Sequence, residues 1–263
     1  MGHLRGGTMH RFFVPADCLK ANPVTLSGPL AHQLTHVLRL RPGERITLLD
    51  NTGWAYEVEL SKVTAQQTEG EVRRKTLATG EPRTKITLYQ ALLKGDHFEL
   101  VLQKGTELGI VDFVPLISER CVVAHLDQAS AKAARWQRII LEAAEQSGRG
   151  RLPVLRPATL FAPACEQAGR RGLSLIPWEG EKSTSLRDVL GQRKGEAGTA
   201  TQKSRPFAIN LFIGPEGGFS TAEIVQARGY GLIPVTLGAR LLRAETAGLV
   251  AATAILYELG DLE

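Results

Sequence analysis

The strongest chemical signal in the sequence is the segment 210–223, which reads NLFIGPEGGFSTAE. An apolar run leads into Gly214, and Ser220 followed by Glu223 three residues later has the pattern of a capping box that opens a helix. Glycines let backbone N–H groups approach a ligand where no Cβ intrudes, and ligands of open parallel sheets bind at the carboxyl ends of strands. The segment predicts a ligand-binding turn, although a tight strand-to-helix connection without a ligand explains the glycines equally well.

Two common phosphate-binding motifs are excluded for this turn. The Walker pattern needs a lysine followed by serine or threonine after its glycines, whereas Phe219 and Ser220 stand there. The glycine spacing also does not match G-x-G-x-x-G.

A second segment, residues 235–248, reads VTLGARLLRAETAG. A strand is expected to end near Gly238, and a turn carrying Arg240 and Arg243 then leads into a helix that begins near Glu245. Small residues in that helix allow close packing, so most of them are assigned to the core. Charged side chains beside two glycine turns are more readily explained by a site than by a core, which singles out Arg243 and Glu245.

Composition and charge limit the function classes. The chain has 263 residues, of which 43% are hydrophobic and 22% are charged, a globular composition that argues against disorder. The longest nearly apolar stretch, 247–257, is shorter than the ~20 residues that a membrane span needs. With no recognisable signal peptide, we expect a soluble, cytoplasmic protein without a membrane partner. The net charge is +5, and the basic excess is concentrated in residues 1–43, which hold five basic residues and one acidic residue. Such a concentration suits an anionic partner. Judged from charge alone, however, an ordinary solvated surface is the better explanation.

Cysteine and histidine spacing gives no metal site. Cys18, Cys121 and Cys165 stand far apart without a C-x-x-C pair, as expected for reduced thiols packed as small hydrophobes. His32 and His36 are spaced i, i+4, but no cluster of further ligands lies near them, so a place on a helix surface is the better interpretation. No metal is expected.

Two domains are expected from the element pattern. Residues 1–8 form a glycine-rich extension, and residues 9–79 favour a small barrel-like domain with strands at 11–14, 46–50, 55–60 and 68–76 and one helix at 29–38. Residues 80–83 are predicted as a linker.

From residue 85 onward, strands alternate with helices. Strands are expected at 86–92, 111–116, 173–177, 208–214 and 233–237, and helices at 97–108, 129–147, 221–228 and 245–259. This alternation predicts an α/β domain with a mostly parallel sheet flanked by helices. Residues 191–205 contain almost no apolar side chains and are predicted as a mobile surface loop.

Several segments together resemble the RsmE family of 16S ribosomal RNA uridine N3-methyltransferases in the SPOUT superfamily. They are LFIGPEGGFS at 211–220, LGARLLRAETA at 237–247, KGTELGI at 104–110 with PLISERCV at 115–122, RWQRIILEAAEQSGR at 135–149, and the N-terminal HRFFV and HVLRLRPGERITLLD. The resemblance extends from Met9 to the C-terminus. It departs from the family in the loop at 191–205, which is longer than expected.

The resemblance implies a fold and partners that composition does not. It implies a PUA-like RNA-binding barrel over 9–79 and a SPOUT methyltransferase domain over 83–263, with a deep trefoil knot at roughly 174–263. Knots are almost absent from proteins, so no sequence pattern by itself predicts one. It also implies a homodimer, S-adenosylmethionine as the cofactor and 16S ribosomal RNA of the small subunit as the partner. The implied cofactor-binding residues are Ile176, Pro177, Gly214, Gly217, Gly218, Leu237, Gly238, Leu242, Arg243 and Ala247.

The implied reaction gives roles to charged residues. The uracil N3 carries a proton and is a poor nucleophile until that proton leaves, so an arginine near the uracil oxygens and a carboxylate acting as a base would both help. We expect Arg243 to stabilise the developing charge and Glu216 or Glu245 to act as base or orienter. Either glutamate can instead brace a loop by accepting backbone N–H bonds, and this is the alternative that we favour.

Other charged residues are expected to contact RNA. The candidates are Arg11, His36, Arg39, Arg41 and Arg149. Glu107 and Arg120 are also motif positions, and for them we favour ion pairs that brace the fold. Two alternatives stay open: a non-catalytic RNA-binding assembly factor with this fold, and a SPOUT methyltransferase that acts on another position such as a ribose 2′-hydroxyl.

Overall fold

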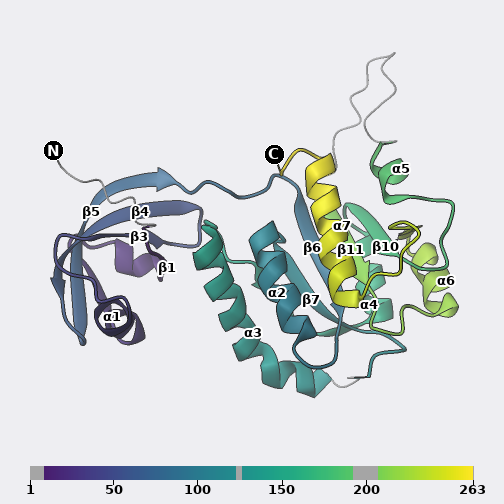
Figure 1. Cartoon of the computed structure of the whole chain (residues 1–263), viewed down its shortest axis with the longest axis horizontal. Helices are drawn as coiled ribbons and strands as arrows, with labels where there is room; N and C mark the ends of the chain where they lie inside the picture. Colours follow the sequence, from purple (N-terminus) through teal and green to yellow (C-terminus); the bar gives the residue numbers. More distant parts are fainter. Residues whose placement is uncertain (1–8, 123–125, 192–206, 263) are drawn as a thin grey trace, which may run out of the picture. The chain divides into compact units, whose positions relative to one another are not determined.

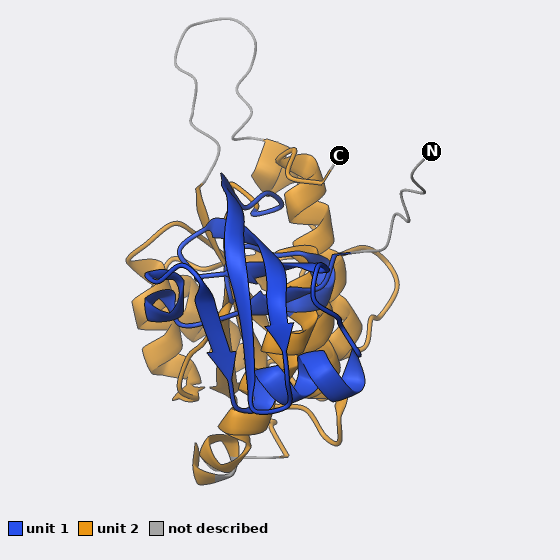
Figure 2. Cartoon of the chain, turned by 90° about the vertical axis from the view of Figure 1, so that its left-hand side faces the viewer, with its two compact units in different colours: residues 1–81, 144–152 blue, residues 82–143, 153–263 orange. Residues whose placement is uncertain are grey.

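The computed structural model describes residues 9–122, 126–191 and 207–262 (Figure 1). The chain divides into two compact units, residues 1–81 with 144–152 and residues 82–143 with 153–263 (Figure 2). The division near residue 81 falls in the expected linker. Residues 144–152, which include the end of a long helix, belong to the first unit. The expected extension at 1–8 and residues 192–205 of the expected loop lie outside the described residues.

The first unit is built on a five-stranded sheet in the order β1-β3-β4-β5-β2. Its strands are β1 (Arg11–Phe13), β2 (Val24–Ser27), β3 (Arg45–Leu49), β4 (Trp54–Val63) and β5 (Gln67–Leu77). Strands β1 and β3 run parallel, and the other neighbours run antiparallel. Because strand side chains alternate between faces, Ile46 and Leu48 of β3 enter one apolar core with Val58 and Leu60 of β4.

The expected helix at 29–38 is present only in part. A 3-10 turn, η1 (Ala16–Leu19), precedes α1 (Pro29–His32), which begins at Pro29 because a proline is tolerated in the first turn. The chain then widens into a π-helical turn, η2 (Gln33–Val37), and leaves it at Arg39 with φ +55°. The short strand β2 was not predicted from the sequence.

The second unit contains a sheet whose paired strands, within the described residues, all run parallel, in the order β12-β10-β11-β6-β7-β8 with β9 also paired to β7. Its strands are β6 (Lys85–Ala91), β7 (Asp112–Ile117), β8 (Val154–Leu155), β9 (Thr159–Leu160), β10 (Leu173–Pro177), β11 (Ala208–Ile213) and β12 (Ile233–Val235). The expectation of a parallel α/β domain is confirmed.

Helices cover both faces of this sheet (Figure 1). They are α2 (His97–Leu108), α3 (Leu126–Ser147), α4 (Phe161–Gly169), α5 (Leu186–Gly191), α6 (Thr221–Gly229) and α7 (Ala244–Glu258). Side chains of α2, α3, α5 and α7 share one apolar core, whereas α4 and α6 pack on the other face against Phe212. The sequence missed β8, β9, α4 and α5 because each is short or has no capping side chain to mark its start.

Helix α7 packs unusually closely on the sheet. A Cβ added at Gly248 would lie 3.0 Å from Oε1 of Gln90 and 3.4 Å from Cγ1 of Ile213. The small residue therefore fixes the distance between α7 and strands β6 and β11, and with it the position of the residues at the start of α7.

The cysteines are free, and Cys121 and Cys165 are buried. Burial raises the pKa of the Cys165 thiol to about 12, with a further contribution from the charge of Glu223, so this thiol is a packed apolar group, as expected. Within the described residues, no helix has the length and apolarity to cross a membrane, and no group of three potential metal ligands occurs.

Candidate active site

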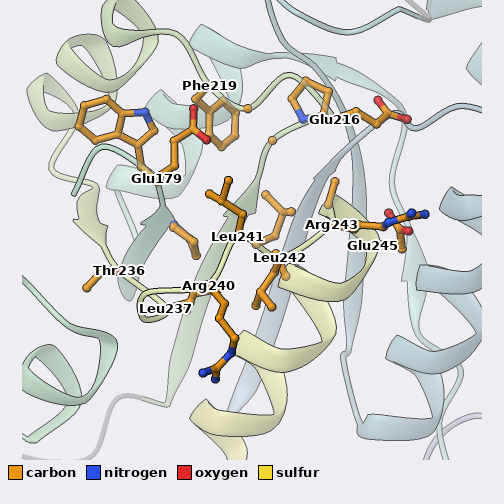
Figure 3. Close-up of a pocket in the computed structure, with 18 of the residues that line it drawn as sticks. Glu179, Glu216, Phe219, Thr236, Leu237, Arg240, Leu241, Leu242, Arg243 and Glu245 are labelled. Carbon is orange, nitrogen blue, oxygen red and sulfur yellow. The ribbon is translucent and has the colours of Figure 1, made fainter. Parts of the chain in front are cut away.

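A pocket of about 500 Å³ lies where three neighbouring strands of the second unit end (Figure 3). Pro177 closes β10, Ile213 closes β11, and Thr236 directly follows β12, and all three line the pocket. The wall is completed by the turn after β11, the turn after β12 and the first residues of α2 and α7. Parallel strands bring their carboxyl ends to one edge, which explains why both glycine turns meet there.

The turn after β11 has a strained backbone that only glycine adopts easily. Gly218 has φ +65° and donates its N–H to the carbonyl of Pro215 at 2.9 Å. Nη1 of Arg120 donates to the carbonyl of Gly217 at 2.8 Å, so Arg120 has the bracing role favoured from the sequence. Glu107 likewise pairs with Lys104, at 2.8 Å on the surface of α2.

The predicted capping box at the start of α6 is present. Oγ of Ser220 accepts the N–H of Glu223 at 3.2 Å, and the Glu223 carboxylate accepts the N–H of Ser220 at 2.9 Å. Glu119 adds two bonds that the sequence did not indicate. Its carboxylate accepts the Ser220 hydroxyl at 2.6 Å, and its N–H donates to Glu223 at 2.9 Å. The loop after β7 therefore holds the glycine turn from a distant part of the chain.

Glu216 lies on the exposed rim of the same turn. Its Oε1 accepts the backbone N–H of Lys94 at 2.9 Å. This bond ties the glycine turn to the loop before α2, which is the bracing role favoured for this glutamate.

The turn after β12 is tied to the segment after β10. The N–H of Trp178 donates to Val235 at 3.0 Å, and the N–H of Thr236 donates to Thr184 at 2.8 Å. Gly238 has φ +111°, so the chain turns back there without side-chain strain. This arrangement presents Leu237 and Leu242 to the pocket.

Glu181 stabilises the segment after β10. The hydroxyl and N–H of Ser183, the N–H of Thr184 and the charge of Arg228 lower the pKa of Glu181 to about 2. The carboxylate therefore stays ionised under ordinary conditions and organises this wall of the pocket.

Arg243 and Glu245 stand at the start of α7, beside each other in Figure 3. Arg243 is the N-terminal cap residue, is exposed and lines the pocket, and no described residue forms an ion pair or hydrogen bond with its guanidinium. Glu245 is 9% exposed, and its Oε1 lies 3.3 Å from Nδ1 of His97 at the start of α2. The pocket thus holds a free cation beside a buried carboxylate.

Most of the predicted cofactor-binding and catalytic residues come together in this pocket. Its lining includes Pro177, Gly214, Glu216, Gly218, Leu237, Gly238, Leu242, Arg243, Glu245 and Ala247. Ile176 is fully buried and does not line the pocket, because alternation along β10 turns its side chain toward the other core. Gly217 is also outside the lining, and its Cα faces the side chain of Arg120.

Several lining residues were not predicted. They are Lys94, His97, Trp178, Glu179, Lys182, Phe219, Thr236 and Leu241 among others. Lys94 and His97 follow β6, the strand whose carboxyl end borders that of β11. The strand-end rule applied to β6 would have singled them out.

The predicted RNA-contacting residues all belong to the first unit. His36, Arg39 and Arg41 are exposed. Arg11 is half-buried, and burial lowers the pKa of its guanidinium. Arg149 contradicts the prediction, because it is 3% exposed and pairs with Glu81 at 2.8 Å, which leaves the guanidinium inaccessible to a phosphate.

Comparison with known proteins identifies the family. Residues 80–256 match the model of the RNA methyltransferase domain. The ribosomal RNA small subunit methyltransferase E of Synechocystis is 36% identical over 92% of this chain and 75% of its own length, and that of Bacillus subtilis is 30% identical over 95% and 97%. The chain belongs to the RsmE family of RNA methyltransferases.

Solved structures of methyltransferases with bound cofactor agree. The Neisseria gonorrhoeae ribosomal RNA small subunit methyltransferase E, bound to S-adenosyl methionine, is 34% identical, with a TM-score of 0.78 and coverage of 95% of this chain and 98% of that chain. A Legionella pneumophila methyltransferase in complex with the cofactor SAM is 30% identical, with a TM-score of 0.80 and the same coverage. The expectation of an RNA methyltransferase is thereby confirmed.

Proposed function

We propose that this enzyme transfers a methyl group from S-adenosylmethionine to N3 of one uridine in 16S ribosomal RNA of the small subunit. The observation that carries the proposal is the free guanidinium of Arg243 beside the buried Glu245 in a pocket between two glycine turns. A cation there favours the negative charge that develops on the uracil oxygens when N3 loses its proton. The small-subunit substrate is supported by the names of the relatives.

The pocket fits the cofactor. Gly218 and Gly238, both at positive φ, leave room for close backbone approach. Leu237, Leu242 and Phe219 offer apolar surface to a purine ring, while Glu179 adds a carboxylate suited to a ligand with cationic groups. S-adenosylmethionine supplies an already activated methyl group on a sulfonium sulfur. The residues that would hold it also include Pro177, Gly214 and Ala247, with backbone contacts from Ile176 and Gly217.

The chain itself must position the base and handle its proton. A uridine has to leave its stack before N3, on the pairing edge, becomes reachable. Arg243 then stabilises the uracil oxygens, Glu245 acts as base or orienter, and Glu216 holds the glycine turn through Lys94.

The first unit binds the RNA in this proposal, as a PUA-like barrel. Arg39, Arg41 and His36 present exposed groups suited to phosphates, and Arg11 extends the same basic section. The support for a PUA-like fold is the five-stranded sheet around one core with a short helix.

The proposed knot lies in residues 174–263. Strand β12 ends at the edge of the sheet beyond β10, and the chain then returns as α7 to contact β11 and β6. The turn between them is held against the segment after β10 by the bonds of Trp178 and Thr236. These crossings support a chain end that passes behind an earlier loop.

The proposed homodimer uses the outer face of α7. That face carries an apolar hollow with Val250 43% and Tyr257 72% exposed. Light scattering tests this assembly: wild-type protein is expected at twice the chain mass, and Tyr257→Glu is expected to shift it toward the monomer.

Mass mapping of modified RNA tests the reaction. Small subunits and free 16S ribosomal RNA that lack the modification are incubated with enzyme and S-adenosylmethionine, and the product nucleosides are identified. The expected product is 3-methyluridine at one position. A 2′-O-methyl nucleoside would replace the proposal by the ribose alternative, and cofactor binding without any methylated product would favour the non-catalytic assembly factor.

A further inference from the structure

His97 is the only histidine among the described residues that line the pocket. It is the first residue of α2, and its side chain is 48% exposed, so part of the imidazole is open to the pocket. Its Nδ1 lies 3.3 Å from Oε1 of Glu245, whose side chain is 11% exposed. The carboxylate of Glu245 therefore lies within ion-pair distance of Nδ1, and no described residue forms a hydrogen bond or ion pair with Nε2 of His97.

Packing fixes this pair. Helices α2 and α7 contact each other, and Phe98, next to His97, packs in their shared core. Glu245 lies in the first turn of α7, where the helix dipole favours a negative charge. The pair is thus set by two helices and not by a loose loop.

Other charged groups lie near His97, and some of them have partners of their own. Asp96 stands at the N-cap position of α2 without a capping bond from its side chain, and Nη2 of Arg135 approaches its Oδ1 to 3.9 Å. Lys94 and Arg243 line the pocket on either side. Glu216, the other candidate base, is occupied by the backbone N–H of Lys94 at 2.9 Å. His97 therefore keeps a ring nitrogen without a described partner for the incoming proton, whereas the Glu216 carboxylate already accepts a hydrogen bond.

We propose that Nε2 of His97 accepts the N3 proton of the target uridine, and that Glu245 is a positioning residue which holds His97 with its proton on Nδ1. This inference rests on the proposed function. The N3–H bond breaks and its proton goes to Nε2. The N3 electron pair forms the bond to the methyl carbon, whose bond to sulfur breaks with its electron pair staying on sulfur. The imidazolium formed beside Glu245 and the neutral thioether leave the charge balanced, and His97 then releases the proton to water. A carboxylate that orients and stabilises an imidazolium is a known arrangement in acyl transfer.

Single-turnover methyl transfer tests the role of His97. His97→Ala is expected to lower the rate about 100-fold or more, with unchanged affinity for S-adenosylmethionine by calorimetry. Added imidazole is expected to restore part of the lost rate in proportion to its concentration, which a purely structural role would not produce. A rate near that of wild type, or a loss that imidazole does not restore, overturns the proposal.

Nitrogen NMR of the protein without cofactor tests the role of Glu245. The His97 signals, assigned by their loss in His97→Ala, are expected to show the Nδ1–H tautomer in wild type and a shift toward Nε2–H in Glu245→Gln. Glu107→Gln, which removes a surface carboxylate on α2, is the matched control and is expected to change neither tautomer nor rate. An unchanged tautomer in Glu245→Gln overturns the positioning role.

The two levels of the proposal fail differently. If wild-type enzyme modifies another atom, mass mapping rejects the proposed function and with it the N3 proton transfer. If wild type makes 3-methyluridine but His97→Ala does so equally fast, only the inference about His97 fails.

Discussion

The guanidinium of Arg149 donates to both carboxylate oxygens of Glu81, from Nε at 3.1 Å and from Nη2 at 2.8 Å. The same carboxylate accepts the backbone N–H groups of Gly150 and Arg151 at 3.1 and 3.2 Å. Arg149 is 3% exposed, so the pair is a buried brace within the first unit. Burial in this pair leaves the guanidinium of Arg149, which follows α3, without the exposed surface that a phosphate contact needs.

Removal of Arg149 is expected to destabilise the protein. Arg149→Ala leaves the partly buried Glu81 carboxylate without its counter-ion, which costs up to about 3–5 kcal/mol, the range for a fully buried pair. Denaturant unfolding measures the loss. The control is Arg138→Ala, which breaks an exposed i, i+4 pair with Glu142 worth about 0.3–0.5 kcal/mol. Similar effects of the two variants would contradict the brace.

Glu81 also makes stability depend on pH. Burial alone would raise the pKa of Glu81, but the bonds from Arg149 and the two backbone N–H groups outweigh it and hold the pKa below its ordinary value of 4.5. A lowered folded-state pKa stabilises the protein above the unfolded-state pKa, and this contribution is lost as pH falls through the folded-state value. Unfolding midpoints measured from neutral to acid pH should therefore fall less steeply in Glu81→Gln than in wild type. Parallel curves would argue against this contribution.

The backbone turn at Gly238 is expected to shape the cofactor pocket. Gly238→Ala places a side chain at φ +111°, which costs about 1–2 kcal/mol and shifts Leu237 and Leu242. Gly231, at φ +84° in the turn before β12 and outside the lining, is the matched control with the same kind of strain. Both alanine variants should lose stability, but only Gly238→Ala should lose affinity for S-adenosylmethionine by calorimetry. Equal affinities of the two variants for S-adenosylmethionine would show that the turn at Gly238 does not shape the cofactor pocket.

Arg243 is expected to act on the rate more than on cofactor affinity. Arg243→Ala removes a pocket cation that has no described ion-pair partner and should lower single-turnover methyl transfer about 10²- to 10³-fold. Arg170→Ala, which removes an exposed arginine paired with Glu166 on α4, is the control with equal loss of charge. Turnover near wild type in Arg243→Ala, with an intact fold, would exclude charge stabilisation by this residue.

Arg39 and Arg41 are expected to contact phosphates. Each neutralised phosphate adds about 0.7–0.9 to the slope of log affinity against log salt concentration. The double alanine variant should therefore bind 16S ribosomal RNA more weakly and with a smaller salt slope than wild type. An unchanged salt slope in the double variant would show that neither arginine contacts a phosphate.

The sequence by itself determined the local features of this protein. The Ser220–Glu223 capping box was readable because its two bonds join residues three apart. The buried strands β6, β10 and β11 were readable because apolar runs of strand length are bounded by turn residues. The family resemblance then predicted that both glycine turns contribute to one cofactor pocket. This is physically possible because parallel strands end at the same edge of a sheet.

Tertiary structure alone decided which distant side chains meet. Glu119 reaches Ser220 across 101 positions, and His97 reaches Glu245 through the packing of α2 on α7. Arg149 and Arg39 are both arginines in basic surroundings, yet one is buried against Glu81 and the other is exposed. Burial and pairing of this kind follow from the order of strands and the contact between helices, and no pattern of neighbouring residues encodes them.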